Sequence, residues 1–276
     1  MLIGVPKEIK NHEYRVGLVP SSVKDLVHAG HEVIVQTGAG AGIGSSDDEY
    51  VEAGASIIGT AKEVFAKAAM IVKVKEPQLV ECEMLRPGQL LFTYLHLAPD
   101  PEQTAALIKS GATAIAYETV TAEDRSLPLL TPMSEVAGRM SIQVGAAALQ
   151  KASGGSGVLL GGVPGVAPAK VVILGGGVSG TAAAEMAVGL RAEVVVIDRS
   201  LKRLRELSAL FGNDLKTVYS TVDAIDRYVT DADLVVGAVL IPGDAAPKLV
   251  SRDMVKRMRD GSALVDAESE LEATVK

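Results

Sequence analysis

Short runs of β-branched and other apolar residues alternate with amphipathic segments along most of this chain. The apolar runs of the first half predict strands at 2–5, 32–36, 57–58, 70–74, 89–93 and 113–117. Helices are expected between them at 21–28, 61–68 and 101–110. The first of these helices has Ser21 or Ser22 as its expected N-cap. Alternation of this kind predicts a parallel sheet wrapped by helices.

The same pattern returns in the second half. A long helix is expected from about 134 to 151, followed by a loop rich in glycine and proline at 153–168. Further strands are predicted at 170–174, 192–198 and 234–238, with a helix at 178–190. The fold class is therefore α/β, with two doubly wound parallel-sheet domains over 1–128 and 129–276. The boundary is expected near 128–132, because its prolines stop neighbouring elements from running through it.

The strongest chemical signal is the G-x-G-x-x-G sequence of Gly175, Gly177 and Gly180. A strand precedes it, an alanine-rich helix follows, and the next strand ends in Asp198. The first glycine allows a tight turn, the second lets a pyrophosphate approach the backbone, and the third lets the helix pack on the strand. The amides at the helix N-terminus form an anion site. Because Asp198 can accept hydrogen bonds from an adenosine ribose, this predicts a Rossmann domain that binds NAD rather than NADP.

Other interpretations of the glycines stay open. A glycine-rich turn between a strand and a helix also occurs without a ligand. Arg199 or Arg203 could meet the 2′-phosphate of NADP, although Asp198 occupies the deciding position. The glycines between 38 and 44 lack the required spacing, so they predict a flexible surface loop rather than a second phosphate site.

Composition and charge narrow the class of protein. A length of 276 residues allows two domains of ordinary size, and a net charge of −7 argues against nucleic acid as the main partner. The single cysteine, Cys82, excludes an internal disulfide and is compatible with a reducing cytoplasm. Early charges interrupt any export signal, and glycines and prolines interrupt the longest uncharged stretch, 152–169. We therefore expect a cytoplasmic protein that does not enter a membrane.

Polar side chains follow three strands of the first domain. Arg15 lies in the loop after the first predicted strand. Lys75 directly follows the predicted strand 70–74, and His96 follows the predicted strand 89–93. Open α/β sheets bind ligands at the carboxyl ends of their strands. A guanidinium can grip a carboxylate, and an imidazole can take up and release protons near neutral pH. Together the three side chains predict a pocket for a small carboxylate-bearing substrate.

Taken singly, each of these residues has another interpretation. Arg15 and Lys75 could be solvated surface charges, and His96 could be a core histidine because leucines flank it. The remaining histidines have no ligand spacing, so no metal site is expected.

Several motifs together resemble the alanine dehydrogenase and transhydrogenase α-subunit superfamily. They lie at 6–8, 15–16, 73–77, 95–98, 117–120, 133–139, 161–166 and 237–243. The resemblance runs from residue 1 to about Asp266. It implies reversible, NAD-dependent oxidative deamination of L-alanine to pyruvate and ammonia. It also implies a homo-oligomer, a hexamer in this superfamily.

The resemblance assigns roles to individual residues. Arg15 and Lys75 would bind the substrate, Lys75 would also stabilise charge on its reacting oxygen, and His96 would be the general acid/base. The residues that would contact the cofactor are Ser134, Gly175, Gly177, Val178, Ser179, Gly180, Asp198, Arg203, Ser220, Val239 and Leu240.

The chain departs from the superfamily after Asp266. There the family has apolar residues, a catalytic Asp and a glycine pair, whereas 267–276 is acidic, with Glu270 in place of that Asp. We expect a frayed terminal helix and a shortened C-terminal part. Two alternatives to a working dehydrogenase stay open: an NAD-binding form with impaired catalysis that serves assembly or regulation, and a transhydrogenase-like nucleotide-binding subunit. The presence of Arg15, Lys75 and His96 favours the dehydrogenase over the latter.

Overall fold

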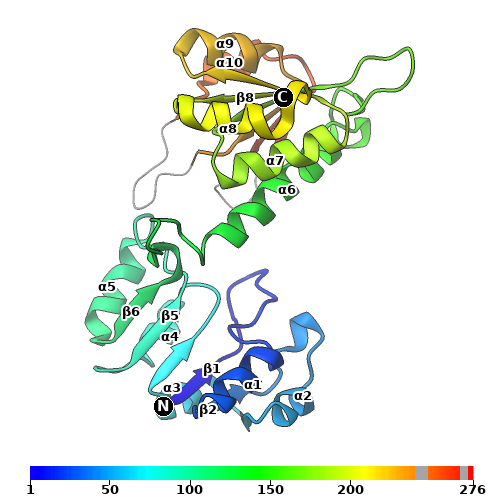
Figure 1. Cartoon of the computed structure of the whole chain (residues 1–276). Helices are drawn as coiled ribbons and strands as arrows, with labels where there is room; N and C mark the ends of the chain where they lie inside the picture. The colour runs from blue at the N-terminus through cyan, green and yellow to red at the C-terminus, as the bar shows by residue number, and fades with distance from the viewer. Residues whose placement is uncertain (240–247, 268–272, 276) are drawn as a thin grey trace. The chain divides into compact units, whose positions relative to one another are not determined.

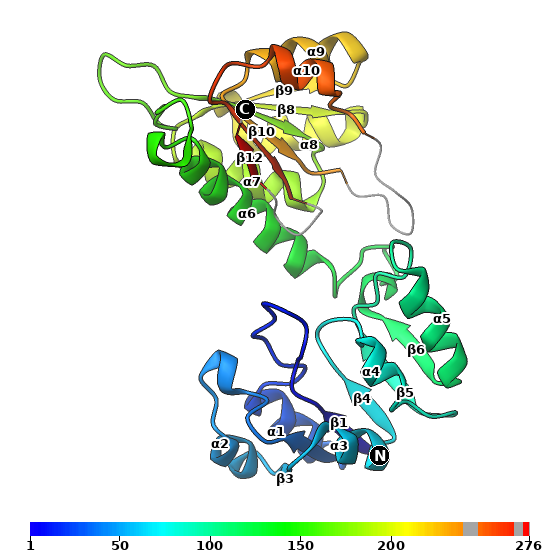
Figure 2. The same cartoon turned by 180° about the vertical axis from the view of Figure 1, so that it is seen from behind.

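The computed structural model describes residues 1–239, 248–267 and 273–275 of the chain. It forms two compact units, Met1–Leu127 and Pro128–Lys276, each a sheet with helices on both faces (Figures 1 and 2). Among the helices of the described residues, none is both long enough and apolar enough to cross a bilayer.

The first unit has a sheet of six parallel strands in the order β3-β2-β1-β4-β5-β6. The strands are β1 (Leu2–Val5), β2 (Glu32–Gln36), β3 (Ser56–Ile58), β4 (Met70–Val72), β5 (Leu90–Thr93) and β6 (Thr113–Ala116). The helices are α1 (Pro20–His28), α2 (Asp47–Glu52), α3 (Ala61–Lys67), α4 (Leu79–Cys82), α5 (Pro101–Ser110) and two 3-10 helices, η1 (Ala41–Ile43) and η2 (Tyr117–Thr119). The strand order reverses between β1 and β4, which makes their carboxyl ends the switch point where such sheets bind ligands.

The second unit has the sheet order β12-β11-β10-β7-β8-β9. Its strands are β7 (Lys170–Leu174), β8 (Glu193–Asp198), β9 (Leu215–Tyr219), β10 (Leu234–Gly237), β11 (Ala263–Asp266) and β12 (Ala273–Val275). Its helices are α6 (Thr131–Ala148), α7 (Val178–Gly189), α8 (Leu201–Phe211), α9 (Val222–Asp231), α10 (Arg252–Arg257) and the 3-10 helices η3 (Lys151–Ser153) and η4 (Gly212–Asp214). The reversal here lies between β7 and β10, beside the glycine-rich turn.

Successive strand residues face opposite cores in both units, because side chains alternate along a strand. In β2, Val33 and Val35 pack with α1 and α2, while Ile34 packs with α3. In β7, Ile173 packs towards α6 and α7, while Val172 packs towards α9. The helices α6 and α7 lie side by side in Figures 1 and 2. Two sheets covered on both faces confirm the predicted α/β class with two doubly wound domains.

Two predicted helix boundaries are wrong. α1 begins at Pro20 with Val19 as its N-cap, rather than after Ser21 or Ser22. α6 begins at Thr131 with Pro132 in its first turn, and it ends at Ala148. In both helices the proline is tolerated because its fixed φ suits the first turn, where no amide donor is needed.

The prediction of a terminal helix at 267–276 is also wrong for Ala273–Val275, the part of it whose secondary structure the structure describes as regular. Residues Ala273–Val275 form β12, which pairs antiparallel with β11. A strand satisfies the backbone groups along the edge of β11, which a frayed helix would leave unpaired. Glu270 lies outside the described residues.

The segment rich in glycine at 38–44, predicted as a flexible surface loop, includes a short helix. This helix is η1, and α2 follows with a capping box between Ser46 and Glu49. A Cβ on Gly42 would overlap the carbonyl oxygen of Tyr14. The glycine therefore allows this segment to pack closely against the loop that carries Arg15.

Candidate functional site

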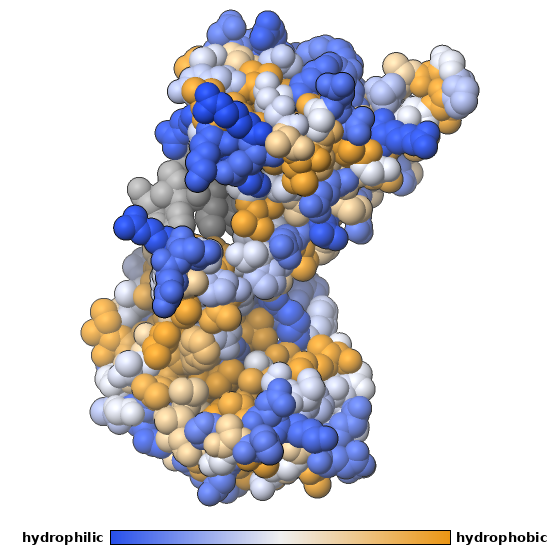
Figure 3. Space-filling model, in the orientation of Figure 1, coloured by the Kyte–Doolittle hydropathy of each residue, from blue (hydrophilic) through white to orange (hydrophobic). Residues whose placement is uncertain are grey.

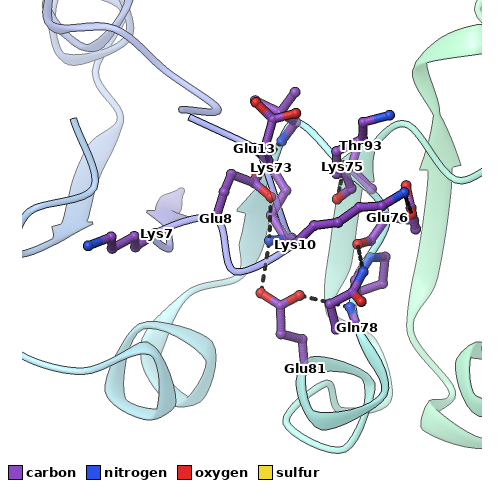
Figure 4. Close-up of polar contacts among 12 residues, drawn as sticks. Lys7, Glu8, Lys10, Glu13, Lys73, Lys75, Glu76, Gln78, Glu81 and Thr93 are labelled. Atoms are coloured by element: carbon purple, nitrogen blue, oxygen red, sulfur yellow. Dashed lines mark hydrogen bonds and ion pairs between the residues drawn. The ribbon is translucent and has the colours of Figure 1, made fainter. Parts of the chain in front are cut away.

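A buried ion cluster occupies the switch point of the first unit. The ammonium of Lys73, just after β4, lies 3.0 Å from Glu8 Oε2 and 2.8 Å from Glu81 Oε1 (Figure 4). All three side chains are almost fully buried. Burial raises the pKa of Glu8, and the charge of Lys73 opposes that rise.

The carboxylates of this cluster also hold backbone amides. Glu8 Oε1 accepts a hydrogen bond from Val74 N at 2.7 Å, and Glu81 Oε2 accepts one from Gln78 N at 2.8 Å. The loop after β1, the end of β4 and the start of α4 are thereby fixed to one another. Lys75 lies in the short stretch of chain between the anchored amides of Val74 and Gln78.

Lys75 itself is half-buried, and its backbone is held from the neighbouring strand. Thr93 Oγ1, at the end of β5, donates a hydrogen bond to the carbonyl oxygen of Lys75 at 2.9 Å. Among the described residues, the Lys75 ammonium has no hydrogen-bond or ion-pair partner. It is the group of this site that a ligand anion can meet.

Arg15 is held by Glu13 through a two-pronged contact. Its Nε donates to Glu13 Oε1 at 2.8 Å, and its Nη2 donates to Oε2 at 2.6 Å. These hydrogen bonds raise the pKa of Arg15. Burial would raise the pKa of Glu13, but the hydrogen bonds from Arg15 and the charge of Lys75 bring it below its ordinary value. The Glu13 carboxylate thus lies within the electrostatic reach of both predicted substrate-binding cations.

Two close backbone contacts place the loop that carries Arg15. A Cβ on Gly17 would lie 2.5 Å from the carbonyl oxygen of Val72, at the end of β4. Gly42 approaches Tyr14 from another segment. Since neither contact leaves room for a side chain, the loop is held against the same strand end from which Lys75 emerges.

His96 follows β5 and is exposed, so the interpretation as a core histidine is wrong. Its ring stacks on Tyr94 with centroids 6.0 Å apart, and Tyr94 in turn meets Tyr117 edge to face at 5.0 Å. Burial raises the pKa of Tyr94, and the charge of Arg15 opposes the rise. Tyr94 thus contacts the imidazole and lies within the electrostatic reach of Arg15.

Two side chains that sequence reasoning missed lie near the predicted residues of this unit. Glu13 is hydrogen-bonded to Arg15, and the charge of Lys75 contributes to lowering the pKa of Glu13. Tyr94 stacks on His96, and the charge of Arg15 opposes the rise in the pKa of Tyr94. The arrangement offers cations for a carboxylate or carbonyl oxygen beside an exposed proton carrier, which suits polar chemistry on a small keto or amino acid.

The glycine-rich turn of the second unit lies at its own switch point. Gly175 has φ +100°, and a Cβ there would clash with Ala238 and Val239. A Cβ on Gly180 would overlap the carbonyl oxygen of Gly175, so α7 could not pack this close with any other residue. Gly177, in contrast, has open space within 4 Å of a Cβ position. The open side at Gly177, beside the α7 N-terminus, suits the approach of a phosphate.

Asp198 and Arg203 hold the peptide units of Gly176 from opposite ends. Asp198 Oδ2 accepts from Gly176 N at 2.7 Å, and Arg203 Nε donates to Gly176 O at 2.5 Å. Asp198 Oδ1 accepts from Ser200 N at 2.7 Å. Ser220 N donates to the Asp198 carbonyl at 3.0 Å, which places Ser220 beside the end of β8. Each carboxylate oxygen keeps a second lone pair with which to accept from a ribose hydroxyl.

The other predicted cofactor residues lie around the start of α7. Val178 is exposed, whereas the Ser179 hydroxyl is buried and has no hydrogen-bond partner in the described part of the chain. Ser134 is half-buried in the first turns of α6, one turn before Gly138, where α6 meets the carbonyl of Ser179. Val239 packs against Gly175. Leu240 lies outside the described residues.

Comparison with known protein families gives two adjoining matches. The model for the N-terminal domain of alanine dehydrogenase/PNT matches residues 4–137, and that for the C-terminal domain matches residues 141–271.

Individual relatives agree with these matches. An alanine dehydrogenase from Methanococcus maripaludis is 59% identical over 266 residues, covering 96% of this chain and 71% of the relative. One from Bacillus subtilis is 56% identical over 266 residues, covering 96% of this chain and 70% of the relative. Among solved structures, an L-alanine dehydrogenase aligns with a TM-score of 0.91 and 55% identity, covering 100% of this chain and 76% of the other. A transhydrogenase from Sinorhizobium meliloti aligns with a TM-score of 0.81 and 28% identity, covering 96% of this chain and 77% of the other.

Proposed function

Because the chain belongs to the alanine dehydrogenase/PNT family and is an oxidoreductase, we propose that it interconverts L-alanine and pyruvate. The reaction is L-alanine plus NAD⁺ and water to pyruvate, ammonium, NADH and a proton. The observation that carries the proposal is the Lys75 ammonium, unpaired among the described residues, at the carboxyl edge of the sheet where the loops of Arg15 and His96 also begin.

The substrate's carboxylate is bound by Arg15, whose guanidinium is oriented by Glu13. Lys75, as a cation, stabilises negative charge on the oxygen of the carbonyl and of the tetrahedral adduct. Oxidation at Cα leaves an imine, which water attacks. His96 removes a proton from that water and returns one to the departing ammonia. Its exposed position beside Tyr94 lets it exchange protons with solvent between these steps.

The residues of the second unit fit NAD. Gly177, Val178 and Ser179 at the start of α7 would hold the pyrophosphate, and Asp198 would accept from the adenosine ribose. NAD supplies the hydride acceptor when bound. Ser134, Ser220, Arg203, Val239 and Leu240 complete the proposed set. Arg203 would contribute to cofactor binding mainly by holding the glycine-rich turn, through its hydrogen bond to the carbonyl oxygen of Gly176.

Steady-state kinetics test the proposal directly. We expect NAD-dependent oxidation of L-alanine and NADH-dependent reductive amination of pyruvate by the purified chain. The alternatives give different results. An impaired form would bind NAD with neither activity, and a transhydrogenase-like subunit would pass hydride between nucleotides without responding to alanine.

Asp198→Ala should weaken NAD binding about tenfold to a hundredfold, since a hydrogen bond to a charged acceptor contributes about 1.5–3 kcal/mol. Discrimination against NADP should relax, because the 2′-phosphate no longer meets a carboxylate. Calorimetric titration with both nucleotides measures the change, and Asp214→Ala, at an exposed position of the same unit, should leave both affinities unchanged. Equal affinity of the unaltered chain for NAD and NADP would contradict the specificity proposed for Asp198.

We also propose that the chain forms a homo-oligomer. Apolar side chains show on the face of the first unit over α5 and β6 in Figure 3, where Ile108 is 77% exposed and Ile115 is 40% exposed. β6 is the last strand of its sheet. Exposed apolar surface beside a sheet edge is the kind that assemblies cover. Light scattering during size exclusion measures the mass, and a monomer at micromolar concentration would contradict the proposal.

A further inference from the structure

The segment 117–120 belongs to the family signature but has no role in the function proposed above. It begins with η2 (Tyr117–Thr119), directly after β6, the strand next to β5. Because the sheet is parallel, the carboxyl ends of β5 and β6 meet at one edge. η2 therefore lies beside the loop that carries His96.

Glu118 holds the backbone of that loop. Its Oε1 accepts hydrogen bonds from His96 N at 2.8 Å and from Leu95 N at 3.1 Å, and its Oε2 is 3.3 Å from Leu95 N. Glu118 is half-buried, and the two amides are consecutive along the chain. Successive amides that converge on one anion form a nest, which fixes the peptide units between them.

The conformation of His96 explains why such a holder is needed. Its φ is +47°, in the left-handed region that residues other than glycine rarely adopt. A conformation of this kind costs about 1–3 kcal/mol and persists only when surrounding contacts impose it. The Glu118 carboxylate provides that constraint at His96 itself.

The neighbouring residue constrains the imidazole ring. Tyr117 packs edge to face on Tyr94, and Tyr94 stacks on the His96 ring at an interplanar angle of 20°. Phe92 also meets Tyr117 edge to face, with centroids 4.3 Å apart. Consecutive residues of η2 thus act on the backbone and, through Tyr94, on the ring of the same histidine.

We propose that Glu118 is a positioning residue, which sets the orientation of His96 through the amides of residues 95 and 96. The proposal rests on the proton-transfer role proposed for His96. The effect is assigned to the reach of the Glu118 oxygens, because Oε1 contacts the amides of both Leu95 and His96.

Two conservative variants separate the effect of the reach of the Glu118 oxygens on turnover from the effect of the Glu118 charge. Glu118→Gln keeps an oxygen at the position of Oε1 without the charge, so kcat for reductive amination of pyruvate should stay within about threefold of the unaltered enzyme. Glu118→Asp keeps the charge but retracts the oxygens by one methylene, so kcat should fall about tenfold to a hundredfold. The KM for pyruvate should change less than about twofold in both variants, because Arg15 and Lys75 hold the substrate. Glu123→Ala, at an exposed position of the following loop, is the matched control and should alter neither constant.

Hydrogen–deuterium exchange gives a readout that does not depend on turnover. The peptide covering Leu90–Ala98 should gain up to two fast-exchanging amides in Glu118→Asp and none in Glu118→Gln. Faster exchange throughout the first unit would instead indicate general destabilisation and would overturn the positioning role. The positioning role would also be overturned if Glu118→Asp were active and Glu118→Gln inactive. The charge of the side chain, rather than the reach of its oxygens, would then determine turnover.

His96→Asn separates this inference from the function on which it rests, since asparagine tolerates the left-handed region. If His96→Asn turns over normally, the proposed role of His96 fails. If His96→Asn abolishes turnover while Glu118→Asp is fully active with unaltered exchange, the positioning role alone fails. We expect a large loss in His96→Asn, no further loss when Glu118→Asp is added to it, and unchanged NAD affinity in every variant.

Discussion

Lys75→Ala should lower the turnover of alanine and of pyruvate by about a thousandfold or more, while NAD affinity stays within about twofold. Removing one preorganised donor that stabilises developing negative charge typically costs about a hundredfold to a thousandfold in kcat. Lys75 is proposed both to bind the substrate and to stabilise that charge, so losing it affects two steps. The groups proposed to hold NAD all lie in the second unit. Steady-state assays in both directions and a calorimetric NAD titration on the same preparation measure the two effects.

Lys62→Ala is the matched control for Lys75→Ala. Lys62 is an exposed lysine of α3 in the same unit, and its loss should leave kcat, KM and NAD affinity unchanged. If reductive amination of pyruvate is unaltered in Lys75→Ala, the substrate pocket is misplaced. A parallel loss of NAD binding would also count against the assignment, because the residue would then act on the fold or on the cofactor.

Hydrophobic periodicity predicted the six strands of the first unit and β7, β8 and β10 of the second, because buried parallel strands are continuous apolar runs. The strands β9, β11 and β12 and the helices α8, α9 and α10 were not predicted. β1, β2 and α5 have the bounds expected from the sequence. The short helices α2 and α4 were not predicted, since four to six residues carry too little periodicity to detect. The start of α1 was misplaced because serine is a good N-cap in isolation, while Pro20 sets the first turn here.

The site was only partly predictable, because its supporting contacts join residues far apart in the sequence. Glu8 and Lys73 are 65 positions apart, and Glu118 lies 22 positions after His96. No local spacing reveals such pairs. The spacing of Lys73 and Lys75 carries no such signal, because side chains two positions apart in a strand point to the same side, and both lysines lie beyond the end of β4 at Val72. Glu13, two residues before Arg15, is a local partner that the sequence could have suggested.

Lys73→Met should destabilise the first unit by about 3–5 kcal/mol, because it leaves Glu8 and Glu81 buried without their cation. Methionine keeps most of the apolar volume of the lysine stem, so the effect reports the charge rather than a cavity. For a unit of this size the loss corresponds to a fall in the melting temperature of about 10 °C or more. Differential scanning calorimetry measures it. Lys216→Met, which removes an exposed pairing with Glu193, is the control and should change stability by less than about 1 kcal/mol.

A triple variant tests whether the loss comes from uncompensated charge. Glu8→Gln and Glu81→Gln, added to Lys73→Met, leave no buried charge while keeping oxygens that can accept from Val74 N and Gln78 N. Replacing a whole buried ion cluster is often far less harmful than removing one member, so the triple variant should recover at least half of the lost stability. Recovery of stability without recovery of turnover would place the functional importance of the cluster at Lys75, which lies between the two amides that the cluster anchors. If the triple variant is less stable than Lys73→Met alone, the cluster stabilises the fold through its hydrogen-bond geometry, and the charge-based explanation is wrong.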